Sequence, residues 1–310
     1  MGDPVQFVVE RIKANDMGTC AALAQSEGWG LLMNRRNQNI FWRALIDRAA
    51  RPAASSEADP LALAKFFISN RLDPNAPLDT GELPLNALMQ RDARLAGQAA
   101  KEIRAINLNA SDRDGRTPAM QAVELLRTQP SGPGFVVLSE LVGSPAFDLN
   151  SRDQGAAVCF KALALAPIAA AHGDHQAAMD GALALIGSLH GKGYDFNAAR
   201  ETPDVNARFG AQINTPLAYC VKKAALWLEW GGAGGRAERA GSTVWAIATE
   251  LIRRGADPCL QMETGQRVQL MELCRKSHFP AGMLQSLESG LLAQSIGPVS
   301  AVKKKPARRL

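Results

Sequence analysis

Four histidines and five cysteines are the first candidates in this sequence of 310 residues for binding a metal or attacking a substrate. His172 and His175 flank Asp174, and His190 follows further along the chain. Zinc catalysis needs an HExxH helix or a third ligand at a defined spacing, and the sequence has neither. We therefore predict a structural role for these histidines and no metal site.

The cysteines stand at positions 20, 159, 220, 259 and 274. Their odd number and the absence of a CxxC pair predict neither a disulfide framework nor a zinc site. Cys159, Cys220 and Cys274 are candidates for a nucleophile beside a histidine. However, Cys159 and Cys220 lie in predicted helices among Ala, Leu and Tyr, where a thiol packs and is inert. No GxSxG elbow, kinase signature or paired-carboxylate motif occurs, so we predict no catalytic residue and no cofactor.

A glycine cluster and a tryptophan cluster are also predicted to have structural roles. Residues 231–235 are rich in glycine but lack the GxxxxGK[ST] or GxGxxG context of a phosphate-binding loop. Residues 231–241 are therefore interpreted as a flexible link between helices. Trp227, Trp230 and Trp245 are predicted to fill the gap between long helices, and an exposed one would be a candidate binding anchor.

The composition favours helices, and the chain outside its C-terminal tail has no net charge. Aromatic residues make up only 5% of the chain, and Ala and Leu are frequent, which favours an all-α fold. The net charge of +5 comes from the tail, residues 301–310, which holds five of the 35 basic residues and no acid. A neutral remainder predicts no specific nucleic-acid binding, and no apolar run is long enough to predict membrane insertion.

The tail sequence leaves several interpretations open. Its cluster of lysines and arginines is compatible with a nuclear-localisation signal, a contact to phosphates or acidic lipids, or a secretion signal at the C-terminus. The simplest interpretation is a solvated end that aids solubility.

A phrase consisting of an apolar helical run, a small-residue turn and an Asp/Asn pair recurs five times. Its copies are Leu72-Asp73-Pro74-Asn75, Ile106-Asn107-Leu108-Asn109, Phe147-Asp148-Leu149-Asn150, Tyr194-Asp195-Phe196-Asn197 and Ala256-Asp257-Pro258-Cys259. A helix start follows at Pro84, at Thr117-Pro118 and at Thr215-Pro216, because Thr caps a helix and Pro suits its first turn. The copies are 34, 41, 47 and 62 residues apart.

Helix ends are also marked. A helix is predicted to end near Ala171, a turn at Gly173 follows, and a second helix runs from about Gln176 to His190. Gly255 is predicted to end another helix. Pro167 is expected to kink or break the long helix over residues 155–171.

These motifs resemble ankyrin repeats. The resemblance is carried by Asp112-Arg113-Asp114-Gly115-Arg116-Thr117-Pro118, by Glu250-Leu251-Ile252-Arg253-Arg254-Gly255-Ala256-Asp257-Pro258 and by Ala171-His172-Gly173-Asp174-His175. It covers residues 38–292, with residues 1–37 as a helical N-terminal cap and 293–310 as a basic tail. It implies an all-α solenoid of about six irregular helix pairs with β-turn fingers. Because ankyrin units run near 33 residues, insertions are expected near 198–214, an enlarged finger, and near 231–241.

The resemblance implies a scaffold that binds another protein on its concave face and fingers. The residues assigned to that surface are Leu78, Asp79, Thr80, Asn86, Gln90, Ser111, Asp112, Arg113, Gln121, Glu124, Ser151, Arg152, Asp153, Tyr219, Gln261, Met262 and Glu263. An inhibitor or immunity-type protein that blocks one enzyme is the alternative, followed by an enzyme with its site in the insertions. Ala- and Arg-rich usage suggests a bacterial gene. We expect a monomer in the cytoplasm, or an effector secreted into a host cell.

Overall fold

The structure is a computed structural model that describes residues 3–49, 51, 59–129, 133–149, 155–197, 200–202, 212–217, 235–256, 259–261 and 267–269. The chain divides into two compact units, Met1–Asp195 (unit 1) and Phe196–Leu310 (unit 2). Each unit is described by itself.

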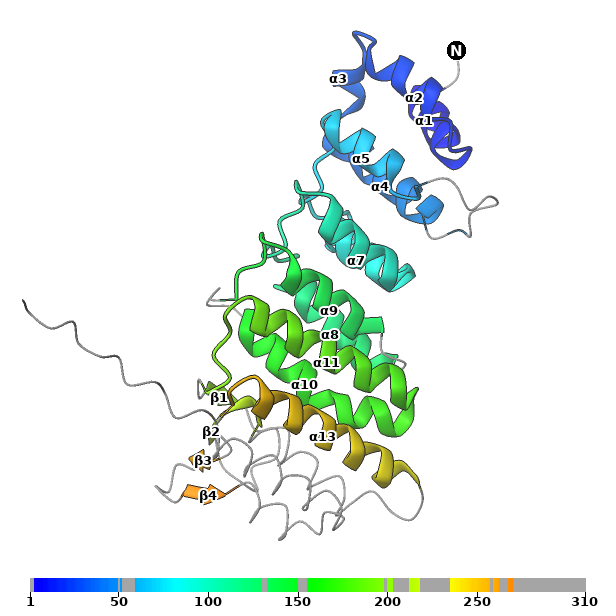
Figure 1. The fold of residues 1–310 in the computed structure, drawn as a ribbon. Coiled ribbons are helices and arrows are strands. Elements are labelled where there is room, and N and C mark those ends of the chain that lie inside the picture. Colours follow the sequence, from blue (N-terminus) through cyan, green and yellow to red (C-terminus); the bar gives the residue numbers. More distant parts are fainter. Residues whose placement is uncertain are drawn as a thin grey trace, which may run out of the picture. The chain divides into compact units, whose positions relative to one another are not determined.

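Unit 1 is built from packed helices, so the expected all-α class is confirmed for its described residues (Figure 1). The helices are α1 (Pro4–Lys13), α2 (Met17–Ala24), α3 (Trp29–Leu32), α4 (Arg35–Ala49), α5 (Ala62–Ser69), α6 (Pro84–Arg91), α7 (Ala93–Glu102), α8 (Pro118–Thr128), α9 (Pro133–Gly143), α10 (Gly155–His172) and α11 (His175–Gly191). The predicted cap region therefore consists of α1 to α3 and the start of α4.

Side chains define where several of these helices begin. Thr117 accepts a hydrogen bond from the N–H of Met120, and α8 starts at Pro118 as predicted. Pro84 starts α6 in the same way, although Leu83 provides no side-chain cap. Aspartates cap the second helix of two pairs, Asp92 at α7 and Asp174 at α11.

The helix ends before Leu72, Tyr194 and Ala256 share one geometry, which α1 also adopts, with Asn15 (φ 56°) before the donor N–H of Asp16. The N–H of Leu72 donates to the carbonyl of Phe67, that of Tyr194 to Leu189 and that of Ala256 to Leu251. Such a 6→1 bond requires a left-handed residue just before the donor. Gly193 (φ 73°) and Gly255 (φ 97°) fill that position, whereas after α5 it is filled by Arg71 (φ 81°).

The helices of unit 1 form two rows. The first-helix row consists of α4, α6, α8 and α10, in which each helix contacts the next. The second-helix row contains α7, α9 and α11, which lie side by side (Figure 1). Helices α6 and α7, α8 and α9, and α10 and α11 also contact each other within their pairs. Two adjacent rows let each helix pair bury its apolar side on the next pair.

The core between the rows is aliphatic, with aromatic rings concentrated near the N-terminus. Phe41, Phe67 and Phe135 are completely buried. The Phe67 ring lies 5.8 Å from that of Phe41 and 5.5 Å from that of Trp29, which joins α5 to α4 and α3. Glycine permits close approach further along: a Cβ on Gly181 of α11 would lie 2.5 Å from the Cβ of Phe135.

Unit 2 contains one long described helix and two short hairpins. Strands β1 (Arg200–Thr202) and β2 (Gln212–Asn214) pair antiparallel, with Glu201 opposite Ile213. Helix α13 (Gly235–Arg253) follows, and strands β3 (Cys259–Gln261) and β4 (Arg267–Gln269) pair in the same way. The first hairpin falls within residues 198–214, the segment predicted as an enlarged finger.

Two segments that were predicted to interrupt helices are helical: the break considered at Pro167 does not occur, and part of the predicted flexible link belongs to a helix. Helix α10 continues through Pro167 to His172, since the neighbours are mostly alanine and leucine, which favour helix and pack against α8 and α11. Residues 235–241, predicted as part of a flexible link, form the first turns of α13. There the helix-favouring Arg236, Ala237 and Glu238 outweigh the glycines. The basic tail 293–310 lies outside the described residues.

Candidate protein-binding groove

Two tight loops connect successive helix pairs of unit 1. We call residues 76–83 loop A and residues 110–117 loop B. In loop A, the N–H of Leu78 donates to the carbonyl of Glu82 (2.7 Å) and that of Gly81 to the carbonyl of Leu78 (2.8 Å). Loop B repeats both bonds 34 residues later, from Asp112 to Arg116 and from Gly115 to Asp112. Gly81 (φ 96°) and Gly115 (φ 75°) supply the left-handed residue that each turn needs.

Loops A and B contact each other directly. The N–H of Arg113 donates to the carbonyl of Gly81 (3.1 Å). A Cβ on Gly81 would lie 3.3 Å from Cδ of Arg113, so the arginine side chain passes over the glycine. The two loops therefore hold a fixed spacing.

The loop ends are joined by asparagine side chains, which we call the asparagine bridges. Nδ2 of Asn75 donates to the carbonyl of Ala105 (2.9 Å), while its Oδ1 accepts from the N–H of Asn107 (2.6 Å). Asn109 repeats both bonds, to Ala146 (2.9 Å) and from Asp148 (3.0 Å). Each bridge satisfies a backbone carbonyl and N–H of the following loop. In unit 2, Nδ2 of Asn197 likewise donates to the carbonyl of Gly255 (2.9 Å).

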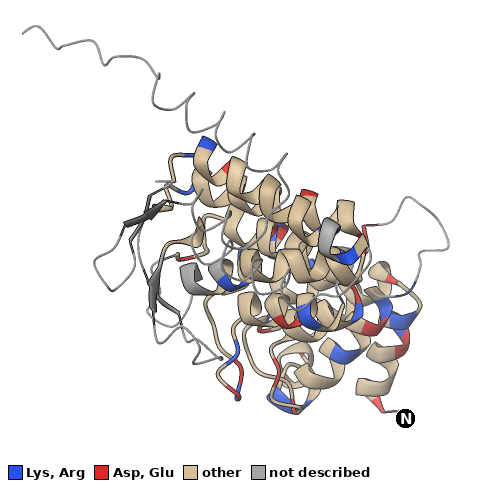
Figure 2. Cartoon of the chain, turned by 90° about the horizontal axis from the view of Figure 1, so that it is seen from below, with Lys and Arg blue, Asp and Glu red and all other residues tan. Residues whose placement is uncertain are grey.

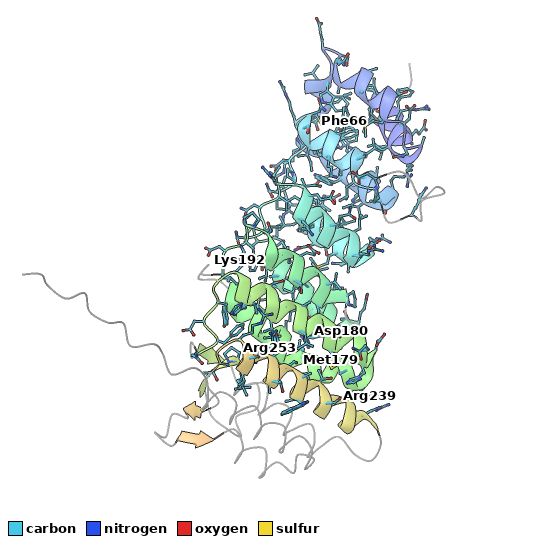
Figure 3. The ribbon with its side chains drawn as sticks, viewed as in Figure 1. Phe66, Met179, Asp180, Lys192, Arg239 and Arg253 are labelled. Atoms are coloured by element: carbon cyan, nitrogen blue, oxygen red, sulfur yellow. The ribbon has the colours of Figure 1, made fainter. Side chains whose placement is uncertain are left out.

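A lysine provides a further connection between loop ends. Nζ of Lys192, which follows α11, donates to the carbonyls of Ser144 (2.5 Å) and Phe147 (3.0 Å) after α9. Figure 3 labels Lys192 on the loop side of the helices. Desolvation in this position lowers the pKa of Lys192. The loop side of unit 1 is thus held together by repeated polar contacts.

A groove opens between loop A and the first-helix row. Its volume is about 330 Å³, and we call it the α4–α6 groove. Helix α4 contributes three lining residues, loop A contributes three, and α6 contributes three. They are Arg43, Ile46, Asp47, Leu78, Thr80, Glu82, Ala87, Gln90 and Arg91. The volume is at the lower end of the range of small-molecule sites, roughly 300–1,000 Å³.

Polar contacts fix the shape of this groove. Nη2 of Arg43 lies 2.5 Å from Oδ1 of Asp79, which connects α4 to loop A. Nε2 of Gln90 donates to Oε1 of Glu82 (2.7 Å), which connects α6 to the same loop. Because both helices hold loop A, the groove is formed before any partner arrives, and less entropy is lost on binding.

The groove carries charged side chains of both signs that have no ion-pair partner within the described residues. Asp47 and Arg91 are exposed. Within the described residues neither has an opposite charge at ion-pair distance or a hydrogen bond from its side chain. The Glu82 carboxylate accepts a hydrogen bond from the uncharged amide of Gln90. Positive and negative positions are interspersed over the described part of the chain (Figure 2), in agreement with the neutral body expected from the sequence.

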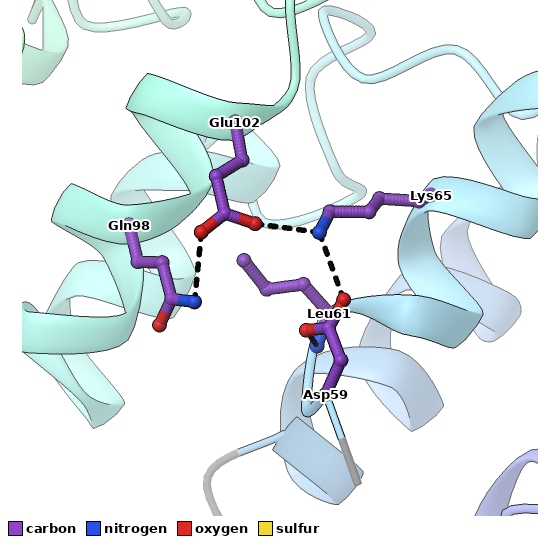
Figure 4. Close-up of polar contacts among 5 residues, drawn as sticks. All are labelled: Asp59, Leu61, Lys65, Gln98 and Glu102. Carbon is purple, nitrogen blue, oxygen red and sulfur yellow. Dashed lines mark hydrogen bonds and ion pairs between the residues drawn. The ribbon is translucent and has the colours of Figure 1, made fainter.

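A second cluster of charges connects α5 to α7 (Figure 4). Nζ of Lys65 contacts Asp59 (2.8 Å) and Glu102 (2.5 Å), and Gln98 donates to Glu102 (2.9 Å). The hydrogen bond to Asp59 and that to Glu102 raise the pKa of Lys65. The hydrogen bond from Lys65 lowers the pKa of Glu102. Burial alone would raise the pKa of Asp59, but the bonds from Lys65 and from the N–H of Leu61 outweigh it and lower that pKa.

The predicted contact residues are distributed unevenly. Leu78, Thr80 and Gln90 line the α4–α6 groove, and Asp79 borders it. Ser111 and Arg113 are exposed on loop B. Glu124 pairs with Arg127 on its own helix.

Three polar residues of the predicted contact set are buried instead, and Leu78, which lines the groove, is only 3% exposed. Asn86 is fully buried, and Asp112 and Gln121 are 8% and 7% exposed. The Asp112 carboxylate accepts from the N–H groups of Asp114 (2.9 Å) and Arg116 (2.8 Å), so it holds loop B in shape. These side chains support the surface and do not form it.

The side chains of the other predicted residues lie outside the described part of the chain. Gln261 lies in β3, but its side chain is not described. The remaining ones lie outside the described residues: Ser151, Arg152, Asp153, Tyr219, Met262 and Glu263. Of the three clustered tryptophans, only Trp245 is described, and it is half-buried in α13.

The sequence interpretation missed the contribution of α4. Arg43, Asp47 and Ile46 precede the first copy of the Asp/Asn phrase, so the repeat phase did not reach them. The apolar residues between positions 40 and 46 recur with helical spacing, which could have indicated this. They mark one side of α4 as apolar and leave Arg43 and Asp47 on a different, polar side.

The described thiols are poor nucleophiles. Burial raises the pKa of Cys20 to about 11 and that of Cys159 to about 12, so the thiolate that would react is scarce at neutral pH. Among the residues that the structure describes, no group of three or more His, Cys, Asp or Glu side chains is placed to hold a metal ion. Within the same residues, no helix has both the length and the apolar character needed to cross a membrane.

No protein-family model matches the chain, and no curated protein matches it in sequence.

Proposed function

We propose that the chain is a protein-interaction scaffold, a divergent ankyrin-type solenoid of about six helix pairs. Its binding surface consists of loops A and B together with the first-helix row. The observation that carries the proposal is the α4–α6 groove, which is formed jointly by a loop and two first helices and is lined by three of the residues assigned to a partner surface. The recurrence of one turn geometry in loops A and B supports the repeat class.

The exposed side chains of the two loops suit protein recognition. Thr80, Ser111 and Arg113 are exposed, and their loops are fixed by backbone hydrogen bonds. Rigid loops that present hydrogen-bonding groups and a guanidinium lose little entropy when a partner binds. The composition favours a bacterial adaptor, or an effector that acts in a host cell.

The test is affinity capture from native lysate with the full chain, followed by mass spectrometry. A triple variant, Thr80→Ala with Ser111→Ala and Arg113→Ala, should lose the captured partner while its midpoint of thermal unfolding stays unchanged. Arg94→Ala, at an exposed arginine on the second-helix row, is the matched control and should retain the partner. Equal capture by the triple variant would count against the proposal.

The same capture separates the scaffold from an inhibitor or immunity-type protein. A scaffold should recover several proteins, whereas an inhibitor should recover a single enzyme and reduce its activity when added in purified form.

A further inference from the structure

We propose that the α4–α6 groove binds a short segment of a partner protein that carries an acidic and a basic side chain close together. The inference rests on the proposed protein-binding function and specifies the chemistry of the segment. In this arrangement Arg91 receives the acidic side chain, and Asp47, aided by Glu82, receives the basic one.

The charge pattern of the groove disfavours ligands whose charges are all negative or all positive. A polyanion such as a nucleic acid would meet the carboxylates of Asp47 and Glu82. A purely basic segment would meet the guanidinium groups of Arg43 and Arg91. Since like charges placed together oppose binding, only a segment with both signs satisfies all of the unused groups.

The size and polarity of the groove favour a peptide segment. Six of its nine lining residues are polar or charged, whereas Ile46, Leu78 and Ala87 supply the apolar part. Small-molecule sites are mostly apolar with few polar groups. A volume of about 330 Å³ holds a few side chains and not a whole element of secondary structure. Thr80 and Gln90 add hydrogen-bonding groups for the backbone of the segment.

The groove charges are available without first breaking an ion pair. Arg43 is already neutralised by Asp79 (2.5 Å), and this pair holds loop A in place. Asp47 and Arg91 are exposed, so each contributes modestly to the binding free energy. Selectivity arises because a segment must pair with both residues to bind well.

The probe is a phage-displayed library of random twelve-residue peptides selected against the full chain. Peptides enriched on the wild type should hold Asp or Glu within a few residues of Lys or Arg. Selection against Arg91→Gln should remove the preference for the acid, and selection against Asp47→Asn the preference for the base. A synthetic peptide of the enriched sequence should bind each variant about two- to fivefold more weakly, as expected for exposed ion pairs.

A charge exchange makes the test specific. Arg91→Glu should reject the enriched peptide and should bind a version in which the acid is replaced by Lys. Arg94→Gln, at an exposed arginine outside the groove, is the control and should bind like the wild type. All variants should keep the wild-type unfolding midpoint, because both groove positions are exposed.

Two outcomes would overturn the inference. One is that no peptide is enriched over an empty support. The other is that the enriched peptides lack paired charges or bind Asp47→Asn and Arg91→Gln unchanged. If such peptides instead lose binding to a loop B variant, Ser111→Ala with Arg113→Ala, the groove assignment fails while the proposed protein-binding function stands.

Discussion

A single arginine in a left-handed conformation illustrates how individual residues limit the stability of unit 1. Arg71 has φ 81° at the position where Gly193 and Gly255 end two other helices. A left-handed conformation costs an L-residue about 1–2 kcal/mol. Glycine avoids this cost but loses about 0.5–1 kcal/mol more on folding because its unfolded chain is freer.

We therefore expect Arg71→Gly to stabilise the protein by roughly 0.5–1 kcal/mol. Chemical denaturation followed by circular dichroism would measure the change. Gly193→Ala makes the opposite exchange at an equivalent position, where a Cβ meets no atom within 4 Å. It should destabilise by about 1 kcal/mol from conformation alone. A less stable Arg71→Gly would show that contacts of the arginine outweigh its conformational cost.

Gly181 gives a second prediction, which concerns packing. Gly181→Ala would place a Cβ 2.5 Å from the Cβ of Phe135, so α11 and α9 must move apart. Overpacking of this kind costs about 1–3 kcal/mol, which the same denaturation experiment would detect. Gly191→Ala in the last turn of α11 is the control. Its Cβ meets nothing within 4 Å, and it should leave the stability unchanged or raise it by up to about 1 kcal/mol.

Residue roles were only partly predictable from the sequence. Thr117 and Pro118 could be placed at a helix start, because capping depends on local chemistry. The burial of Asn86, Asp112 and Gln121 could not be predicted, since it depends on how loop B folds over α6 and α8. A polar residue on a repeat can support a loop or face a partner, and its type alone does not distinguish these roles.

The asparagine bridges determine how neighbouring elements are held. Asn109→Ala removes one donor and one acceptor and leaves the carbonyl of Ala146 and the N–H of Asp148 without these partners. We expect it to destabilise unit 1 by about 0.5–1.5 kcal/mol, since both bonds are exposed to solvent. Thermal unfolding and hydrogen exchange at Asp148 would measure this. Asn34→Ala, at an asparagine bonded only near its own helix start, is the comparison: it breaks as many hydrogen bonds, but it should leave hydrogen exchange at Asp148 unchanged.

The Lys65 cluster gives a prediction about pH. The lowered pKa values of Asp59 and Glu102 mean that their ion pairs stabilise the fold above the usual carboxyl pKa of about 4. This contribution is lost as the pH falls through the lowered values. Lys65→Met should therefore be less stable than the wild type at pH 7 by under about 1 kcal/mol, since the pair is exposed. The difference should shrink towards pH 2 and in 1 M salt. A difference independent of pH would assign the effect to packing of the methionine.

Elements were predicted best where local signals agreed. The turn at Gly173 and the helix over residues 176–190 match α11, because capping, glycine and periodicity indicate the same boundaries. The continuity of α10 through Pro167 and the helical start of α13 were not predictable. In both segments, helix-favouring residues and packing outweigh one unfavourable residue type.

For the whole molecule, the described part of unit 1 agrees with an arrangement in which each helix pair mainly contacts its neighbours. The sequence indicated this through the recurring Asp/Asn phrase, which occurs once for each helix pair. The sequence did not indicate the α4–α6 groove. This groove lies between loop A and α4, and α4 comes before the first copy of the Asp/Asn phrase. Its charges are brought together by stacking and not by sequence proximity.

Asn75, Asn109 and Asn197 each donate from Nδ2 to a later backbone carbonyl, although the sequence separation varies from 30 residues (to Ala105) to 37 (to Ala146) and 58 (to Gly255). The added length is therefore accommodated away from the bridged atoms. Codon insertions at a helix-to-helix turn such as the one at Asp92, between Asn75 and Ala105, would then lengthen a pair without shifting the register of adjacent loops. Descendants of this gene could remodel the far side of the protein while its loop side stayed aligned.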